Sequence, residues 1–209
     1  CFILVSSVFS RNQKHIQQEL KNFIQNRERK SMFDEVNATD ARHTLLLLFH
    51  TCVMLGLCTY YYYTGVSPTL FTEVSHSLLL GSFVTTIALF ITCKWIVYNF
   101  INWIFFQKAR NILWMTSFVN LHIWLGILLL PVLLITVYFD ISSRTALFLI
   151  GILLVFAKIL LFWKCFSNFF EKFYGAFHLI LYFCALEILP DLILWKGMEI
   201  ISNILTLKL

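Results

Sequence analysis

Residues 112–139 read ILWMTSFVNLHIWLGILLLPVLLITVYF and contain no Asp, Glu, Lys or Arg. A helix of about 20 apolar residues crosses the hydrocarbon core of a bilayer, and this run is longer than that. A membrane β-strand would alternate apolar and polar residues, whereas this run is continuously apolar. The segment therefore predicts a membrane-spanning helix with a kink at Pro131.

The composition of the whole chain also indicates a protein that lies in a lipid bilayer. Of its 209 residues, 59% are hydrophobic and 13% are charged, whereas soluble domains carry about 25% charged residues. A soluble core of this size would leave large apolar patches exposed to water. The six cysteines lie in apolar segments without a CxxC pair, so we interpret them as small buried hydrophobic residues, with neither a disulfide framework nor a zinc site.

Other apolar runs flank the first one, and we predict an all-α transmembrane bundle with five full spans. The other four predicted spans are residues 44–63, 76–98, 145–166 and 173–195. The second of these continues, or bends, into an interfacial stretch that reaches residue 106. Residues 1–9, CFILVSSVF, are too short to span, and we interpret them as the tail of a sixth, N-terminal helix.

Four regions follow from these spans. Residues 1–9 are the helix tail, residues 10–42 a basic amphipathic segment, residues 43–195 the five-helix bundle and residues 196–209 an amphipathic tail. In the second region Ile16, Leu20, Phe23 and Ile24 form one apolar stripe on a basic helix, which is typical of a helix at a membrane interface or along a partner.

Basic residues are enriched in every second connection. The segment 10–42 has seven, and the second and fourth connections carry Lys94, Lys108, Arg110, Lys164 and Lys172. The first connection has none and the third has only Arg144. The positive-inside rule therefore predicts that residues 10–42 are cytoplasmic and that the C-terminus faces outward.

Several polar residues are predicted to lie inside the spans, where an unpaired ionisable group is costly. These candidates for a ligand site or a proton relay are Glu187, Asp191, Lys158, His50, His122, His178 and Asn120. Glu187 and Asp191 are one helical turn apart and face the same neighbour. Glu187 is placed near the middle of the membrane, next to Pro190, and is the first residue to mutate.

Two interpretations of these residues are open. In the first, Lys158 pairs with Glu187 across a depth mismatch of about 7 Å, and the histidines bind a ligand or relay protons. In the second, Lys158 snorkels to the headgroups, Asp191 reaches the outer interface and the histidines form interhelical hydrogen bonds. We favour the second interpretation for each histidine. No metal-ligand spacing, cofactor motif or nucleic-acid motif is present, so we predict no metal, no cofactor and no nucleic-acid partner.

Residues 173–190, FYGAFHLILYFCALEILP, resemble the C-terminal signature of a family of multi-pass inner-membrane proteins of unknown function from Bacteroidota. Residues 26–33, NRERKSMF, ahead of a leucine-rich helix, are also similar to that family. The resemblance covers nearly the whole chain and implies one more helix before Cys1. It implies a location in the cytoplasmic membrane of a didermic bacterium, and it transfers no activity and no catalytic residues.

Three functions remain in competition. The first is a non-enzymatic subunit or accessory factor of a membrane or envelope complex, which docks through its basic segment and binds a membrane-protein partner or itself. The second is a transporter or a small-molecule- or lipid-binding protein that uses the intramembrane polar residues. The third, a lipid-modifying membrane enzyme, has no nucleophile or metal constellation to support it. We favour the first.

Overall fold

The computed structural model of this protein describes residues 38–66, 75–105, 108–139, 141, 143–169 and 181–207. All regular elements in these ranges are helical, which confirms the prediction of an all-α chain. The predicted helix tail at residues 1–9 and nearly all of the basic segment 10–42 lie outside the described residues. The helices are α2 (Ala38–Val66), α4 (His76–Phe105), α5 (Lys108–Tyr138), α6 (Ser143–Phe169), the π-helical segment η3 (Cys184–Ile188) and α8 (Leu189–Leu207).

Four of these helices are long and apolar enough to cross a membrane. The qualifying stretches are Arg42–Val66, His76–Ile104, Arg110–Tyr138 and Arg144–Phe166. They match the first four predicted spans, because apolar runs with few glycines and prolines contain few residues that favour a turn. Helix α5 continues through Pro131, and α8 continues beyond the predicted boundary at Trp195.

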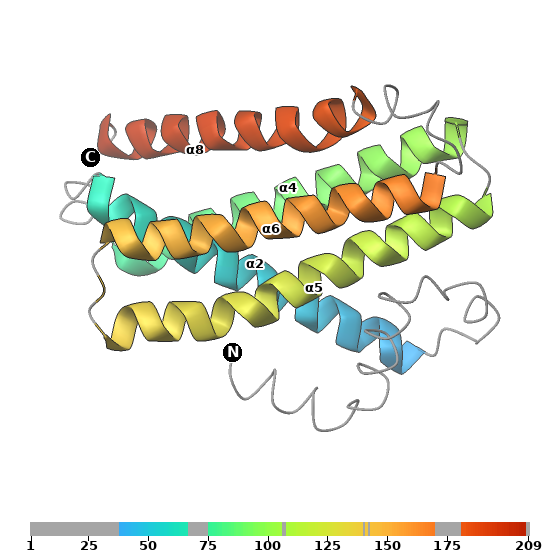
Figure 1. Ribbon diagram of the computed structural model, residues 1–209. Helices are drawn as coiled ribbons and strands as arrows, with labels where there is room; N and C mark the ends of the chain where they lie inside the picture. Colours follow the sequence, from blue (N-terminus) through green and yellow to red (C-terminus); the bar gives the residue numbers. More distant parts are fainter. Residues whose placement is uncertain are drawn as a thin grey trace.

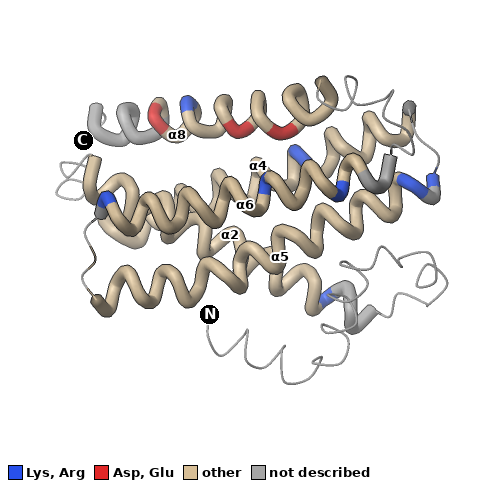
Figure 2. Tube along the Cα trace, viewed as in Figure 1, with Lys and Arg blue, Asp and Glu red and all other residues tan. Residues whose placement is uncertain are grey.

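Successive helices run in opposite directions, so their ends fall into two groups (Figure 1). Helices α4 and α6 end, and α5 begins, at the same end of the bundle. Most of the Lys and Arg residues marked in Figure 2 lie in that half of the molecule, which we call the basic half, whereas the marked Asp and Glu residues lie along η3 and α8 (Figure 2).

Helix α2 packs against both α4 and α5, and small residues set how closely it approaches them. A side chain added at Gly126 of α5 would collide with Thr51 of α2, and one added at Gly56 of α2 would collide with Val84 of α4. The Thr51 hydroxyl donates a hydrogen bond to the backbone carbonyl of His122, 3.0 Å away. Small residues and hydroxyl groups at contacts are how membrane helices associate closely.

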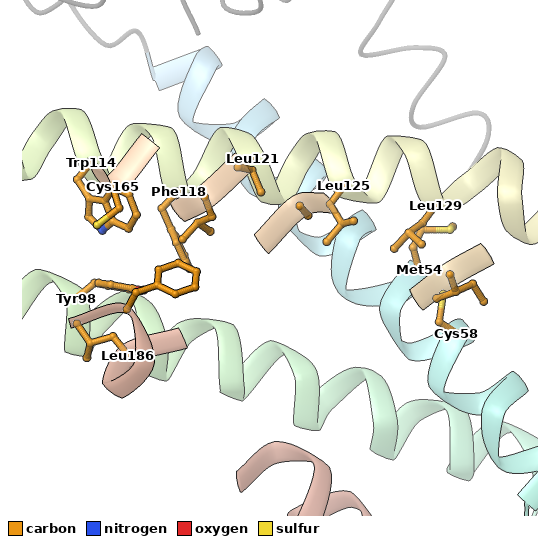
Figure 3. Packing of buried hydrophobic residues seen from close by; sticks show 14 of the residues in the cluster. Met54, Cys58, Tyr98, Trp114, Phe118, Leu121, Leu125, Leu129, Cys165 and Leu186 are labelled. Atoms are coloured by element: carbon orange, nitrogen blue, oxygen red, sulfur yellow. The ribbon is translucent and has the colours of Figure 1, made fainter. Parts of the chain in front are cut away.

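The main hydrophobic core lies where α5 meets α2, α4 and α6 (Figure 3). Trp114 and Phe118 of α5 pack beside Tyr98 of α4, and Leu125 and Met54 continue the core toward the other end. The outer faces of the same helices carry many exposed large apolar side chains, such as Leu89 and Val155. In water those faces would be a severe liability, so lipid is the solvent for which the surface is suited.

A π-helical turn precedes Pro190. Proline has no N–H to donate and its ring clashes with the carbonyl four residues earlier. Here the turn widens just before Pro190, and the backbone N–H of Leu189 donates to the carbonyl of Cys184, five residues back. The wider turn lets the helix pass through the proline without ending, and it changes which side chains share a face.

Candidate functional site

Four charged side chains from three helical segments meet inside the bundle. At Oε2, the fully buried Glu187 accepts a hydrogen bond from the ammonium of Lys94, 2.5 Å away, and another from that of Lys158. Asp191 lies 3.1 Å from Lys94 and 2.6 Å from Lys158, so each carboxylate pairs with both lysines. We call these four residues the ion-pair cluster. Its two cations and two anions give a formal charge of zero.

A tyrosine holds the second oxygen of Glu187. The hydroxyl of Tyr98 donates to Oε1 of Glu187 at a distance of 2.6 Å. The Tyr98 ring is fixed from the other side by Trp114 and Phe118, whose ring centroids lie 5.5 and 5.3 Å away. Both carboxylate oxygens of Glu187 are therefore hydrogen-bonded, which is the condition for keeping a charge in a low-dielectric interior.

Helix α4 and residues 182–191 run antiparallel and match their polar side chains in pairs. Lys94, Tyr98 and Asn102 recur every four residues and so share one face of α4. The hydroxyl of Tyr182 donates to Oδ1 of Asn102, 2.6 Å away, and the rings of Tyr98 and Tyr182 lie 6.0 Å apart. The polar seam, as we name it, consists of Lys94, Tyr98, Asn102, Tyr182, Glu187 and Asp191.

The π-helical turn aligns the second side of this seam. Tyr182 and Glu187 are five residues apart, which in an α-helix places them about 140° apart around the axis. A π-helical turn closes on the fifth residue and brings such a pair nearly into line. Glu187 and Asp191 are four residues apart and stay on the same face. The spacing of the acceptors therefore matches the four-residue spacing on α4.

The ion-pair cluster lies within the apolar length of the helices. Lys158 is eight residues (166 − 158) from the end of its span and Lys94 ten residues (104 − 94) from the end of its own. At about 1.5 Å per residue, these positions are ~12 and ~15 Å from the basic ends. The side chains of Lys158 and Asp191 are nevertheless 36% and 37% exposed, whereas Lys94 and Glu187 are buried. One flank of the cluster is thus uncovered at a depth where lipid chains would lie.

The other predicted site residues lie elsewhere. His50 is buried on α2. The ring of His122 on α5 contacts that of Phe118 at a tilt, with centroids 4.3 Å apart, and its Nδ1 is hydrogen-bonded to the Phe118 carbonyl. Asn120 is partly buried on α5. His178 is outside the described residues.

Metal ligation has no candidate in the described helices. No group of three or more His, Cys, Asp or Glu side chains comes close enough there to hold an ion. The only clustered acids, Glu187 and Asp191, have lysine partners, and the ammonium groups occupy the positions that a cation would take.

A small pocket adjoins the seam on its outer flank. It has a volume of about 100 Å³ and lies between α4 and the η3–α8 segment. Its lining is mostly apolar, with Lys94 and Tyr98 as the polar members, and includes Phe90, Cys93, Val97, Leu186 and Pro190. The surface that lines it is almost wholly apolar, so the pocket suits a small apolar group better than water or an ion, which need polar partners.

Four members of the seam are absent from the residues that the sequence singles out: Lys94, Tyr98, Asn102 and Tyr182. From the sequence, Lys94 is counted as a topological marker of the second connection, but it is buried inside α4, so that interpretation is wrong. Helix α4 continues past Tyr98 to Phe105, in line with the predicted continuation of that span toward residue 106. The four-residue recurrence of Lys94, Tyr98 and Asn102 was the available signal, since in an apolar helix it marks one polar face.

The chemistry open to this arrangement is ion pairing and proton exchange. Glu187 and Asp191 are the groups that can gain a proton, and the two lysines and Tyr98 are the groups that can give one. The described residues around the cluster are otherwise apolar or aromatic. The packing therefore supports a site that holds or moves charge within the membrane.

A family model with the description "Domain of unknown function (DUF4271)" matches residues 1–198. No curated protein and no solved structure has a significant match to the chain. The matched region contains all six members of the polar seam and four membrane-length helices. The chain therefore belongs to the DUF4271 family of domains of unknown function.

Proposed function

We propose that this protein is a non-enzymatic subunit of a membrane complex, and that a partner helix covers the flank of the ion-pair cluster on α6 and α8. One observation carries the proposal: the Lys158–Asp191 pair, 2.6 Å apart, is more than one-third exposed about 12 Å inside the membrane-length part of α6.

Exposing the Lys158–Asp191 pair to lipid would be energetically unfavourable. Charged side chains in the hydrocarbon region almost always face a protein interior or a water-filled space. The neighbours of the pair on the outer surface, Ile159 and Leu192, are apolar and exposed. A polar pair within an apolar surface is what a membrane helix with one hydrogen-bonding side chain would complement. A partner helix that donates a hydrogen bond to Asp191, or accepts one from Lys158, would remove the cost of exposing these charges to lipid.

The same proposal includes the membrane topology. Residues 181–207 lie alongside α4 and α6 from one end of the bundle to the other (Figure 1), and we propose that they form a fifth span. The basic half would face the cytoplasm of a didermic bacterium of the Bacteroidota, with residues 10–42 as a docking element on that side.

Site-specific photo-crosslinking in native membranes tests the subunit proposal. A photoreactive amino acid at Ile159 or Leu192 is expected to form an adduct with one protein partner. Leu134 on α5 is the matched control, because it is apolar and exposed but lies on another helix. Adducts with lipid alone at both test positions, together with a monomer on native gels in mild detergent, would contradict the proposal.

A small-ligand role is the second candidate, and the pocket beside Lys94 and Tyr98 favours it. The small volume and the apolar lining of the pocket limit the ligand to a small apolar group. The test is Glu187→Gln in cells. A folded variant that keeps its partner adducts but loses function supports this role, and a silent variant rejects it.

A further inference from the structure

The polar seam does not end at the ion-pair cluster. It continues toward the basic half through Tyr98 and Tyr182 to Asn102, which is fully buried. Asn102 lies two residues before the end of the apolar span at Ile104. A line of hydrogen-bonding side chains therefore joins the middle of the bundle to its basic end.

Asn102 has an unmet hydrogen-bonding requirement. Its Oδ1 accepts from Tyr182, but its Nδ2 has no partner among the described residues, although the side chain is buried. Burying an amide donor without a partner is costly. Water is the ligand that such a group recruits when a polar boundary is close. Because Asn102 belongs to the seam and lies at its basic end, its unpaired amide marks a hydration site at the entrance.

The seam is closed in the other direction. Beyond Lys94, the buried positions of α4 are Ile87, Phe83 and Leu79, all apolar. Phe83 stacks on Tyr63 with ring centroids 5.3 Å apart, which seals the space between α2 and α4. Access for water from that end would require unpacking this core. The seam is therefore polar on one side of the cluster only.

We propose that the polar seam is a one-sided proton path, by which Glu187 exchanges a proton with water at the basic end of the bundle. This activity is independent of the subunit role proposed above. Its ligand is the proton, carried by water that reaches Asn102.

The proton transfer balances at each atom. A hydronium ion at Asn102 gives a proton to the Tyr98 oxygen as the Tyr98 O–H bond breaks toward Oε1 of Glu187. The carboxylate becomes a neutral carboxylic acid, Tyr98 regains its hydroxyl, and a neutral water is left at Asn102. After this step Glu187 no longer balances two ammonium groups, and among the described residues Asp191 is the carboxylate that still pairs with Lys94 and Lys158.

The groups that face Glu187 decide whether the proton stays. From α4 they are Lys94 and Tyr98, from α6 Lys158 and the thiol of Cys165, and from its own segment Asp191 and Tyr182. His122 on α5 lies behind the Phe118 ring, which it contacts at a tilt. The two ammonium groups oppose proton uptake and Asp191 favours it, and uptake removes both ion pairs of Glu187 while the two ion pairs of Asp191 remain.

Time-resolved infrared spectroscopy of the full chain in nanodiscs tests the path. After a rapid fall in pH, the carbonyl band of a protonated carboxylic acid is expected to rise, and to be absent in Glu187→Gln. Replacing Asn102 with Leu should slow that rise by about tenfold or more, because the water at the entrance loses its anchor. Asn102→Gln, which keeps the amide, should restore most of the rate.

Thr136→Val on α5 is the matched control, since Thr136 is equally buried but lies off the seam and bonds only within its own helix. Its rate should equal that of the parent. Two results would overturn the proton path: no carboxyl band that depends on Glu187, or an unchanged rate in folded Asn102→Leu. Neither result affects the partner adducts at Ile159 and Leu192, so the two proposals fail separately.

Discussion

The ammonium of Lys94 lies 2.5 Å from Oε2 of Glu187, although 93 positions separate the two residues in the chain. This contact joins α4 to the π-helical segment ahead of α8. The same carboxylate holds Lys158 of α6, so a single side chain ties three parts of the bundle together. The stability of the α8 attachment should therefore depend on Glu187 more than on any other polar residue of the cluster.

Glu187→Gln is expected to lower the free energy of unfolding by about 3–5 kcal/mol, because it leaves two lysines with one carboxylate. Unfolding can be followed in detergent with a thiol-reactive dye. Cys52, Cys58 and Cys165 are buried reporters, provided that the other cysteines are replaced by alanine. The matched control is Glu199→Gln, which removes an exposed pair with Lys196 and should change the unfolding temperature little.

Tyr98→Phe tests the hydroxyl apart from the ring. The ring contacts with Trp114 and Phe118 remain, while Oε1 of Glu187 loses its donor. We expect a loss of about 1–3 kcal/mol by the same thiol assay, since a buried charged acceptor is left without a partner. A variant as stable as the parent would show that Oε1 does not depend on this hydroxyl.

Gly126→Ala is expected to destabilise the contact between α2 and α5. The added Cβ would collide with the backbone and side chain of Thr51, so the helices would have to move apart. Gly151→Ala on α6 is the paired change, because nothing lies within 4 Å of the added atom. There the change should be neutral, or stabilising by up to about 1 kcal/mol, through helix propensity alone. Equal unfolding temperatures for the two variants would contradict the close approach.

Cysteine labelling on intact cells tests the proposed orientation. Single cysteines at His76 and Arg144 should react with a membrane-impermeant thiol reagent added outside, and one at Lys108 only after permeabilisation. All three native positions are exposed, and the first two lie at the end of the bundle opposite the third (Figure 1). Labelling of Lys108→Cys from outside, with His76→Cys protected, would reverse the orientation.

The helices were predictable because apolar length is a local property. Residues 112–139 lie almost wholly inside α5, and residues 145–166 inside α6. The pairing of Lys158 with Glu187 was foreseen as one of two alternatives, with a depth mismatch as the objection. That mismatch assumed straight α-helical geometry and took no account of the wider turn at Cys184–Ile188.

The partners of Lys94 were not predictable in the same way. A lysine near a helix end fits the positive-inside pattern equally well whether it faces the headgroups or the bundle. Its direction depends on which face of α4 meets residues 182–191, and that is a long-range property. The three candidate histidines were predicted on three different helices. Their predicted depths alone could not show whether they share one site, because that depends on which helix faces meet.

The equal number of positive and negative charges in the ion-pair cluster has an electrical consequence. A neutral group of charges can shift as a unit along the membrane normal with little work against the transmembrane potential. One added proton gives the cluster a net charge, and moving one net charge through 100 mV involves about 2.3 kcal/mol. In its protonated form the cluster would respond to voltage, and in its unprotonated form it would hardly sense it.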